Sequence, residues 1–285
     1  MLRAFSGSAG LTTPAALLRT SGLPALEARI LLAHVLGWRR TELITRDSES
    51  LDPRLVERFQ HLATRRIAGE PIAQLVGLRE FFGLEFDVTP DVLIPRPETE
   101  LLVETGLAAI ESIKNPRVLD LGTGSGAIAV AIAAMRADAQ VWAVDRSAEA
   151  LAVAARNAAR LLGTNRPLTL LQSDWTGALA PSLRFDLIVS NPPYIADNDP
   201  HLSEGDLRFE PRGALTDEAD GLAAIRAIIE QAPFFLCTGG SLWIEHGYDQ
   251  AAQVRALLSG RGLSDVRSLT DIAGIERISG ALFPA

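Results

Sequence analysis

The stretch "VLDLGTGSGAIA", Val118 to Ala129, decides the fold of this chain. It begins as a short apolar strand, passes through Gly122, Gly124 and Gly126, and continues as an apolar helix. Because glycine has no Cβ, a ligand can approach the backbone of such a loop closely and meet the N-terminus of the following helix. The spacing is GxGxG and differs from the GxGxxG of dinucleotide-binding folds. The stretch therefore predicts a strand, a ligand-binding loop and a helix, in that order.

Strands and helices continue to alternate after this loop. Segments that are apolar nearly throughout are separated by helical segments, which indicates a sheet covered on both faces with largely parallel pairing. The last two segments follow each other without a helix, which favours one antiparallel hairpin at the end. The predicted strands are "RVLDLG", "QVWAVD", "LTLLQSD", "FDLIVS", "GSLWIEHG", "DVRSLTD" and "ERISGALF". We therefore expect an α/β fold with a mostly parallel, seven-stranded sheet.

Two smaller regions precede this sheet. Residues 1–75 predict a small helical bundle, because each helical segment has one apolar face to bury. In "DPRLVERFQHLATRRIAGEP", Asp52 is expected to cap a helix and Pro53 to occupy its first position. Residues 76–97 are punctuated by glycine and proline, which predicts a β-hairpin linker. Residues 98–285 then form the larger domain.

Acidic side chains end two of the predicted strands. Asp145 closes "QVWAVD", where its carboxylate can accept both ribose hydroxyls of a nucleoside. Asp174 and Trp175 end the next strand, where the edge and the face of an adenine would lie. The alternative for Asp145 alone is a cap of the helix that follows it. Together with the glycine loop and Asp174, it favours a nucleoside-binding site.

The tetrapeptide Asn191-Pro192-Pro193-Tyr194 follows the predicted strand "FDLIVS". Proline lacks an amide hydrogen and restricts the residue before it, so this stretch predicts a stiff, irregular exit from the sheet. Ligands of open α/β sheets bind beyond the carboxyl ends of the strands. We therefore expect the tetrapeptide to face the same crevice as the glycine loop and the acidic strand ends. The alternative is a proline-rich turn after an edge strand.

Composition argues against several classes of protein. The net charge of −8 and the pI near 5.1 argue against a broad surface that neutralises phosphates, so no stable nucleic-acid binding is expected. No apolar run is long enough for a membrane span, and "MLRAFSGSAG" lacks the apolar core of a signal peptide, which predicts a cytoplasmic protein. The single Cys237 excludes an internal disulfide. The histidines show no metal-ligand spacing, so no metal is expected; they are His34, His61, His201 and His246.

The motifs, taken in order, resemble a known enzyme class. "DLGTGSG", "VD", "SDW" and "NPPY" are similar to the motifs of class I S-adenosylmethionine-dependent methyltransferases that methylate amino groups. The helical N-terminal part, the linker "FFGLEFDVTPDVLIPRPETELL" and the stretch "HLSEGDLRFEPRGALTDEADGL" further resemble the protein-(glutamine-N5) methyltransferases of peptide chain release factors. This second resemblance extends from about Leu17 to Phe283.

The chemistry of the tetrapeptide suits this class. A planar conjugated nitrogen is a poor nucleophile because its lone pair is delocalised. The Asn191 side-chain oxygen and the Pro192 carbonyl can accept its two N–H bonds and hold the lone pair toward a methyl donor. Tyr194 is expected to stack on the planar group. Since no strong general base is needed, Asn191, Pro192 and Tyr194 are the predicted catalytic residues.

The family resemblance implies a specific reaction. Its members transfer a methyl group from S-adenosyl-L-methionine to the glutamine amide (N5) in the GGQ tripeptide of class 1 release factors, and they leave S-adenosyl-L-homocysteine. It implies a Rossmann-like class I methyltransferase domain and a substrate-docking bundle, and we expect a monomer. The predicted cofactor-binding residues are Gly122, Thr123, Gly124, Ser125, Gly126, Asp145, Asp174, Trp175 and Asn191. The predicted substrate-binding residues are Asn191, Pro192, Pro193, Tyr194, Arg96 and Glu210.

Two short elements carry the last two of these residues. The elements "IPRPETE" and "FEP" resemble family motifs that lie beside the site, and they contain Arg96, Pro97, Glu98, Glu100, Glu210 and Pro211. For Arg96 and Glu210 the alternative is an ion pair that bridges the two domains. The chain departs from the family where "IEHG" replaces a commoner "EIG". This departure is peripheral to the residues of methyl transfer.

Two other functions remain as alternatives. A nucleic-acid adenine-N6 methyltransferase would also present a planar amino group to the tetrapeptide. The acidic balance of the chain argues against it, since such an enzyme usually needs a basic groove. A non-catalytic nucleoside-binding module would not require a rigid corner that accepts an amide.

Overall fold

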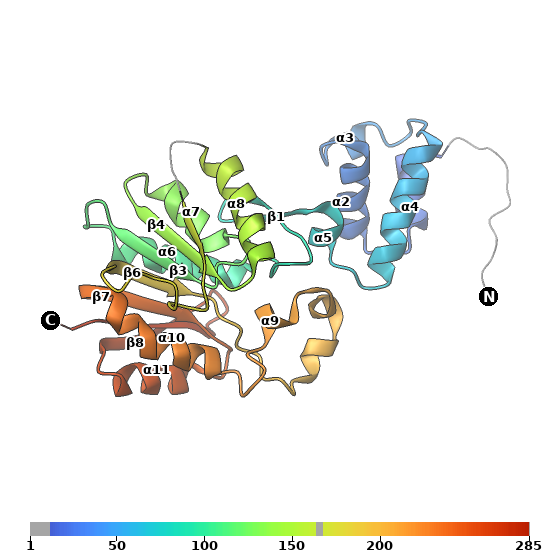
Figure 1. Cartoon of the computed structure of the whole chain (residues 1–285). Coiled ribbons are helices and arrows are strands. Elements are labelled where there is room, and N and C mark those ends of the chain that lie inside the picture. Colours follow the sequence, from blue (N-terminus) through green and yellow to red (C-terminus); the bar gives the residue numbers. More distant parts are fainter. Residues whose placement is uncertain (1–11, 164–167, 285) are drawn as a thin grey trace. The chain divides into compact units, whose positions relative to one another are not determined.

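The structure, a computed structural model, describes residues 12–163 and 168–284. The stretch on which the absence of a signal peptide was predicted, residues 1–10, lies outside the described residues. The chain divides into two compact units, Met1–Gly77 and Leu78–Ala285 (Figure 1). The predicted three-part division at residues 75 and 97, with a docking role for the first part, stays a prediction.

Every regular element described in the first unit is helical, as predicted. Asp52 caps the fourth helix, because its side chain accepts a hydrogen bond of 2.8 Å from the backbone N–H of Arg54. Leu31 and Leu32 of the second helix pack with Phe59 of the fourth in a core of their own. The helices are α1 (Pro14–Thr20), α2 (Ala25–Leu36), α3 (Glu42–Thr45), α4 (Pro53–Ile67) and α5 (Ile72–Val76).

The second unit is built on a seven-stranded sheet with the order β5-β4-β3-β6-β7-β9-β8. Its strands are β3 (Arg117–Leu121), β4 (Gln140–Asp145), β5 (Thr169–Gln172), β6 (Phe185–Ser190), β7 (Leu236–Glu245), β8 (Ser264–Thr270) and β9 (Glu276–Leu282). The first five are parallel, and β9 pairs antiparallel with β7 and β8. The predicted fold is confirmed, including the closing hairpin, which no helix interrupts.

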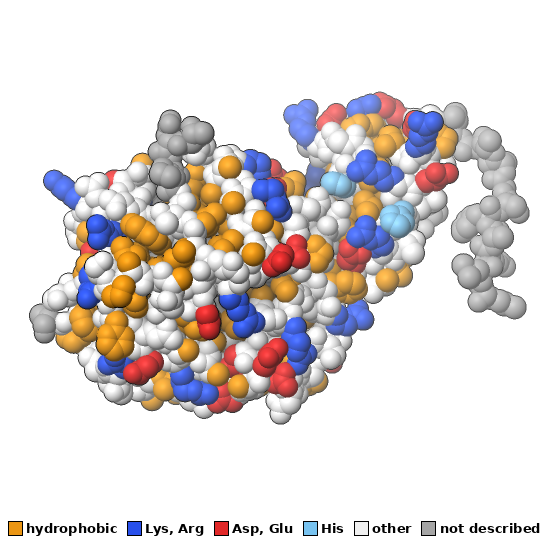
Figure 2. Space-filling view, in the orientation of Figure 1, with side chains coloured by type: hydrophobic (Ala, Val, Ile, Leu, Met, Phe, Trp, Pro, Cys, Tyr) orange, Lys and Arg blue, Asp and Glu red, His pale blue; other side chains and the backbone are white. Residues whose placement is uncertain are grey.

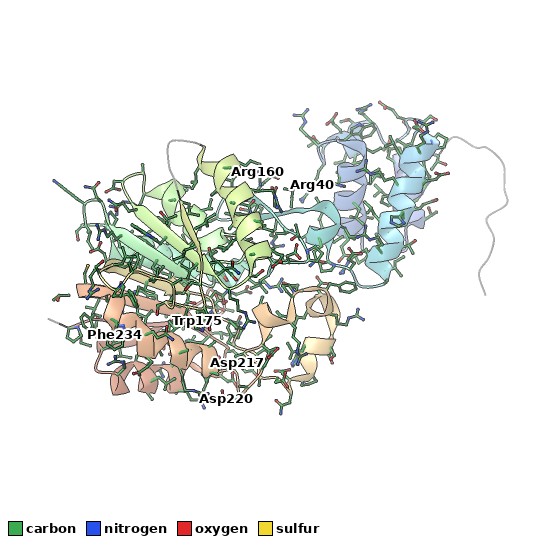
Figure 3. All side chains as sticks on the ribbon, in the orientation of Figure 1. Arg40, Arg160, Trp175, Asp217, Asp220 and Phe234 are labelled. Carbon is green, nitrogen blue, oxygen red and sulfur yellow. The ribbon has the colours of Figure 1, made fainter. Side chains whose placement is uncertain are left out.

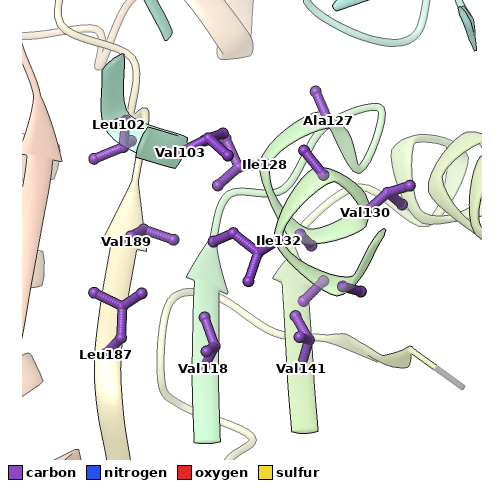
Figure 4. Packing of buried hydrophobic residues seen from close by; sticks show 14 of the residues in the cluster. Leu102, Val103, Val118, Ala127, Ile128, Val130, Ile132, Val141, Leu187 and Val189 are labelled. Atoms are coloured by element: carbon purple, nitrogen blue, oxygen red, sulfur yellow. The ribbon is translucent and has the colours of Figure 1, made fainter. Parts of the chain in front are cut away.

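Helices cover both faces of this sheet. One face packs against α6 (Glu100–Ala109), α7 (Ala127–Met135) and α8 (Ala148–Leu162), and the other packs against α10 (Ala223–Gln231) and α11 (Ala251–Gly260). Successive strand residues point to opposite faces, so Val118 joins the first cluster and Leu119 the second. Figure 4 shows Ile132 of α7 lying over Val118 and Val141 of two neighbouring strands. Each such fully buried side chain contributes about 1.5–3 kcal/mol to folding.

A β-hairpin opens the second unit. It consists of β1 (Leu78–Phe81) and β2 (Leu84–Asp87), paired antiparallel as predicted. Phe81 and Phe86 are buried in the same cluster as α7, so the hairpin belongs to the core of this unit. The buried Asn157 of α8 fastens it further, because its amide donates to the carbonyl of Asp87 and accepts from the Asp87 N–H. A 3₁₀ turn, η1 (Pro97–Thr99), then leads into α6.

The chain between β6 and α10, residues 191–222, makes only short turns of helix, and we name it the insertion segment. Its elements are η2 (Pro200–Ser203), η3 (Gly205–Phe209) and α9 (Arg212–Leu215). Ile195 and Thr216 form a parallel bridge that closes it into a loop. Asp217 anchors its end by accepting from the backbone N–H groups of Gly221 and Ala223. After α10, the turn η4 (Ala232–Phe235) leads into β7.

The surface carries charged side chains of both signs among hydrophobic ones. Figure 2 shows basic and acidic side chains interspersed over the visible face. None of the described helices combines the length and the apolar character that crossing a membrane requires.

Candidate active site

A cavity of about 240 Å³ lies beyond the carboxyl ends of β3, β4, β5 and β6. The strand order reverses between β3 and β6, and open α/β sheets bind ligands at such a switch point. The segments 91–99 and 211–214 contribute further lining residues, namely Asp91, Val92, Leu93, Pro95, Arg96, Thr99, Pro211, Gly213 and Ala214. The predicted site residues that line it are Arg96, Gly122, Thr123, Gly124, Ser125, Asp145, Asp174, Trp175, Asn191 and Pro193. Gly126, Pro192, Tyr194 and Glu210 do not line it.

The three glycines of the loop serve different purposes. All three have a positive φ, between 55° and 83°, and residues with a side chain rarely adopt such angles. A Cβ on Gly124 would meet no other atom within 4 Å, so its backbone is open to a ligand. A Cβ on Gly126 would lie 3.1 Å from the Cβ of Ala154 in α8. Gly126 therefore allows α7 and α8 to pack closely, whereas Gly124 borders the cavity.

Asp145 links the glycine loop to the start of α8. Its Oδ2 accepts from the Gly124 N–H at 2.8 Å, and its Oδ1 accepts from the Ser147 N–H at 2.9 Å. The cap of α8 is Ser147, whose hydroxyl accepts from the Ala150 N–H, so Asp145 is not needed for that role. A carboxylate has about four acceptor positions. Two of them accept from no donor in the described part of the chain, and Asp145 lines the cavity.

Trp175 has an unusual backbone for a large residue. Its φ is +46°, and its ring lies 3.5 Å from the position of a Cβ on Gly122. It is half-buried near the strand ends of the second unit (Figure 3). Asp174 beside it is exposed and also lines the cavity. Left-handed backbone at a bulky residue is uncommon and is often found at ligand sites. The adenine contact of Trp175 stays a prediction.

The side-chain amide of Asn191 is held at the cavity by one hydrogen bond. Its Nδ2 donates to the Thr99 Oγ1 at 3.0 Å. Asn191 lines the cavity, and its Oδ1 accepts from no donor among the described residues, so this oxygen is free to accept a hydrogen bond. We call the stretch Asn191–Tyr194 the corner. Its two prolines restrict the backbone, and Pro192 is buried and Pro193 half-buried, so the corner is rigid.

Tyr194 lies away from the cavity. Its ring packs at the edge of the core beside α10 and α11, and its hydroxyl donates to Glu245 Oε1 at 3.3 Å. Burial raises the pKa of Tyr194, so the phenol keeps its proton. Its backbone carbonyl accepts from Gln250 Nε2 at 3.0 Å. The predicted stacking of this ring on a substrate stays a prediction.

Arg96 and Glu210 form an ion pair with each other. The Glu210 side chain is fully buried, and its second oxygen accepts from the Ile94 N–H at 2.9 Å. Both residues belong to the second unit, so this pair does not bridge the two units. It instead joins the 91–99 segment to the insertion segment. Removing one partner of such a buried pair typically costs about 3–5 kcal/mol.

Three buried polar residues near the site were not found from the sequence: Asp120 on β3, Glu245 on β7 and Thr99 on η1. Asp120 is buried beneath the glycine loop, where its Oδ2 accepts from the Thr123 hydroxyl at 2.6 Å and burial raises its pKa to about 7. Thr99 and Glu245 support Asn191 and Tyr194 as described above. A signal existed for two of them, because Asp120 and Glu245 are single acidic residues in the apolar strands "VLDL" and "LWIE".

Two arginine side chains, Arg96 and Arg146, also line the cavity. Arg146 lines it and donates to the Gly213 carbonyl at 3.3 Å, which connects the end of β4 to the insertion segment. Within the described ranges, no group of His, Cys, Asp and Glu side chains is arranged to hold a metal ion. The site therefore combines a backbone-lined pocket, one amide acceptor and two flanking arginines, Arg96 and Arg146.

Comparison with known proteins covers both units. A family described as the PrmC N-terminal domain matches residues 11–77, and one described as a methyltransferase small domain matches residues 97–205. The release factor glutamine methyltransferase of Burkholderia pseudomallei is 66% identical over 275 residues, which cover 95% of this chain and 96% of that protein. The enzyme of the same description from Escherichia coli is 46% identical over 262 residues, 92% and 93% of the two chains.

A solved structure extends this likeness to the fold. The Thermus thermophilus 16S rRNA N2 G1207 methyltransferase, in complex with AdoMet and guanosine, superposes with a TM-score of 0.53 at 23% identity. The match covers 72% of this chain and 49% of that one. At this identity the likeness concerns the fold alone.

Proposed function

The chain belongs to the release factor glutamine methyltransferases, and from this premise we propose that it methylates the glutamine of the GGQ tripeptide in class 1 release factors, with S-adenosyl-L-methionine as donor. The enzyme is a protein-(glutamine-N5) methyltransferase. The observation that carries the proposal is Asn191, which lines the cavity and whose amide oxygen is free to accept a hydrogen bond while Thr99 engages the nitrogen.

The lining of the cavity fits S-adenosylmethionine. The open backbone at Gly124 suits close approach of a ligand to the N-terminus of α7. The free acceptor positions of Asp145 suit the ribose hydroxyls. Asp174 and Trp175 supply an acceptor edge and an aromatic face for the adenine. When bound, the cofactor supplies an electrophilic methyl group at a sulfonium.

The residues of the corner orient the nucleophile. The glutamine amide nitrogen has two N–H bonds and a delocalised lone pair. We propose that Asn191 Oδ1 and the Pro192 carbonyl accept these two bonds, which turns the lone pair toward the methyl group. The N–CH₃ bond then forms while the S–CH₃ bond breaks, and the nitrogen loses a proton to solvent. No residue has to remove a proton before transfer.

The first experiment tests the substrate. The protein is incubated with methyl-labelled S-adenosylmethionine and a release factor, the same factor with its GGQ glutamine changed to alanine, or double-stranded DNA. Label is expected on the intact factor and on neither of the others. Label on DNA with none on the factor would replace the proposal by the adenine-N6 alternative. The cytoplasmic location and the monomeric state stay predictions.

A further inference from the structure

Gln250 is a buried glutamine to which the reaction above assigns no role. It directly precedes α11, is 8% exposed and does not line the cavity. Its side chain makes no capping hydrogen bond to its own helix, which is the ordinary use of a polar side chain at this position. It bonds instead to the backbone of three other residues. A buried amide that is fully bonded in this way makes the segments around it rigid.

The three hydrogen bonds use both hydrogens of the Gln250 amide and its oxygen. The Oε1 accepts from the Gly247 N–H at 2.8 Å. The Nε2 donates to the carbonyl of Tyr194 at 3.0 Å and to that of Gly221 at 3.1 Å. The orientation of the amide follows, because an N–H can only donate and the two carbonyls can only accept. Since Tyr194 ends the corner and Gly221 lies near the end of the insertion segment, one side chain joins the two ends of that segment.

The two ends of the insertion segment also meet directly at Gly221. Its φ is +79°, and a Cβ on it would lie 2.5 Å from the Tyr194 carbonyl oxygen and 3.0 Å from Gln250 Nε2. A side chain at this position would therefore displace both groups. Asp217 fixes the same residue by accepting from the Gly221 N–H at 3.0 Å. The close approach and the hydrogen bonds of Gln250 thus belong to one arrangement.

The prolines of the corner transmit a movement of Tyr194 to Pro192. Proline locks φ at about −65°, so two consecutive prolines leave few torsions that could absorb a displacement. The Tyr194 hydroxyl donates to Glu245, and its backbone carbonyl accepts from Gln250, so this residue is held at both ends. A carbonyl that orients a nucleophile must be placed closely, because small displacements in an active site slow the reaction strongly.

We propose that Gln250 is a positioning residue for methyl transfer: its amide joins the two ends of the insertion segment and thereby fixes the backbone of the corner at Tyr194. This inference rests on the proposed role of the corner in accepting the N–H bonds of the glutamine. It explains why a glutamine is buried before α11 without capping that helix.

The first test removes the two donated hydrogen bonds and keeps the shape of the side chain. Gln250→Met is expected to lower kcat with a release factor about tenfold. The KM for S-adenosylmethionine should change little, because Gln250 makes no hydrogen bond to the glycine loop or to Asp145. Gln231→Met is the matched control, since Gln231 is half-buried and accepts from the Thr176 hydroxyl, away from the corner. Its kcat should stay within about twofold of the wild-type value.

A pair of glycine variants tests the same arrangement from the other side. Gly221 and Gly239 have the same φ of +79°, but a Cβ on Gly239 would meet no atom within 4 Å. Gly221→Ala and Gly239→Ala therefore carry the same backbone penalty, and only Gly221→Ala displaces the Tyr194 carbonyl. Gly221→Ala is expected to have a kcat at least about threefold below that of Gly239→Ala. This pair decides the question if Gln250→Met does not fold.

A measurement without turnover keeps this inference separate from the proposed function. Amide hydrogen exchange, followed by mass spectrometry, reports on the N–H groups of Ile195 and Asp197, which bond across the insertion segment to Leu215 and Ala219. Their exchange should be faster in Gln250→Met than in the wild type and unchanged in Gln231→Met. Exchange over the glycine loop, residues 118–129, should be the same in all three proteins.

The outcomes distinguish the two levels of the argument. Unchanged exchange in Gln250→Met would overturn the fastening of the insertion segment. Faster exchange with an unchanged kcat, or equal kcat values in the two glycine variants, would overturn the role in positioning. A wild-type protein that labels no release factor would refute the proposed function, while the exchange data would still decide whether Gln250 holds the ends of the segment together.

Discussion

The glycine loop after β3 and the corner at Asn191 after β6 both end a parallel strand at one cavity, yet different interactions hold them. The loop is shaped mainly by backbone, through glycines with positive φ and the Asp145 carboxylate on Gly124. The corner is held by side chains from distant elements, with Thr99 on η1 and Glu245 on β7. The difference suggests that changes in the loop alter cofactor binding, whereas changes behind the corner alter kcat.

The largest effect is expected at the corner itself. Asn191→Ala removes the amide acceptor and should lower kcat at least about a hundredfold, as loss of a preorganised polar group does in other active sites. Its KM for S-adenosylmethionine should change far less. Asn198→Ala is the matched control, because Asn198 is exposed on the same insertion segment. Initial rates with a release factor measure both, and full turnover by Asn191→Ala would remove the acceptor from the mechanism.

The next effect belongs to the loop. Asp145→Ala removes the acceptor of the Gly124 N–H and the proposed ribose contact. Since hydrogen bonds to a charged group contribute about 1.5–3 kcal/mol, KM for the cofactor should rise about tenfold or more, with kcat largely kept at saturation. Asp138→Ala, which removes an exposed carboxylate paired with Arg136, serves as the control. If Asp145→Ala lowered kcat and left KM for the cofactor constant, the loop would not act mainly in cofactor binding.

A stability measurement separates the two uses of glycine. Gly126→Ala forces a side chain into φ +83° and against Ala154, whereas Gly262→Ala meets the same backbone penalty at φ +84° with open space around it. Both should lose about 1–2 kcal/mol in urea unfolding from the left-handed backbone. Gly126→Ala should lose more, because α7 and α8 must shift. Equal losses would mean that the helices adjust freely.

The smallest effect on cofactor binding is expected at Arg146, which follows β4 and bonds to the insertion segment. Arg146→Ala removes the exposed hydrogen bond to the Gly213 carbonyl. Such a bond contributes about 0.5–1.5 kcal/mol at most, so KM for the cofactor should rise only a few-fold. Arg156→Ala on the outer face of α8 is the control. A change as large as that of Asp145→Ala would instead give Arg146 a direct role in binding.

Some parts of the site were predictable because their signals are local. The glycine spacing, Asp145 at a strand end and the two prolines after Asn191 each restrict the backbone within a few residues. The order of strands and helices then brings them to one edge of the sheet. The position of Tyr194 was not predictable in this way, since its ring could turn toward a substrate or toward the core. Its hydroxyl donates to Glu245, which lies on β7, 51 residues further along the sequence.

By itself, the sequence determined the α/β fold, the strand ends that border the cavity and the rigid stretch Asn191–Pro193 at one of them. These follow from periodicity, from glycine and proline, and from polar residues in apolar surroundings, all of which act over short stretches of chain. Only the tertiary structure decided that Arg96 pairs with Glu210, and that Thr99 and Glu245 accept from Asn191 and Tyr194. Those contacts join residues that only the packed sheet brings together, and no local pattern specifies which buried hydroxyl meets which carboxyl.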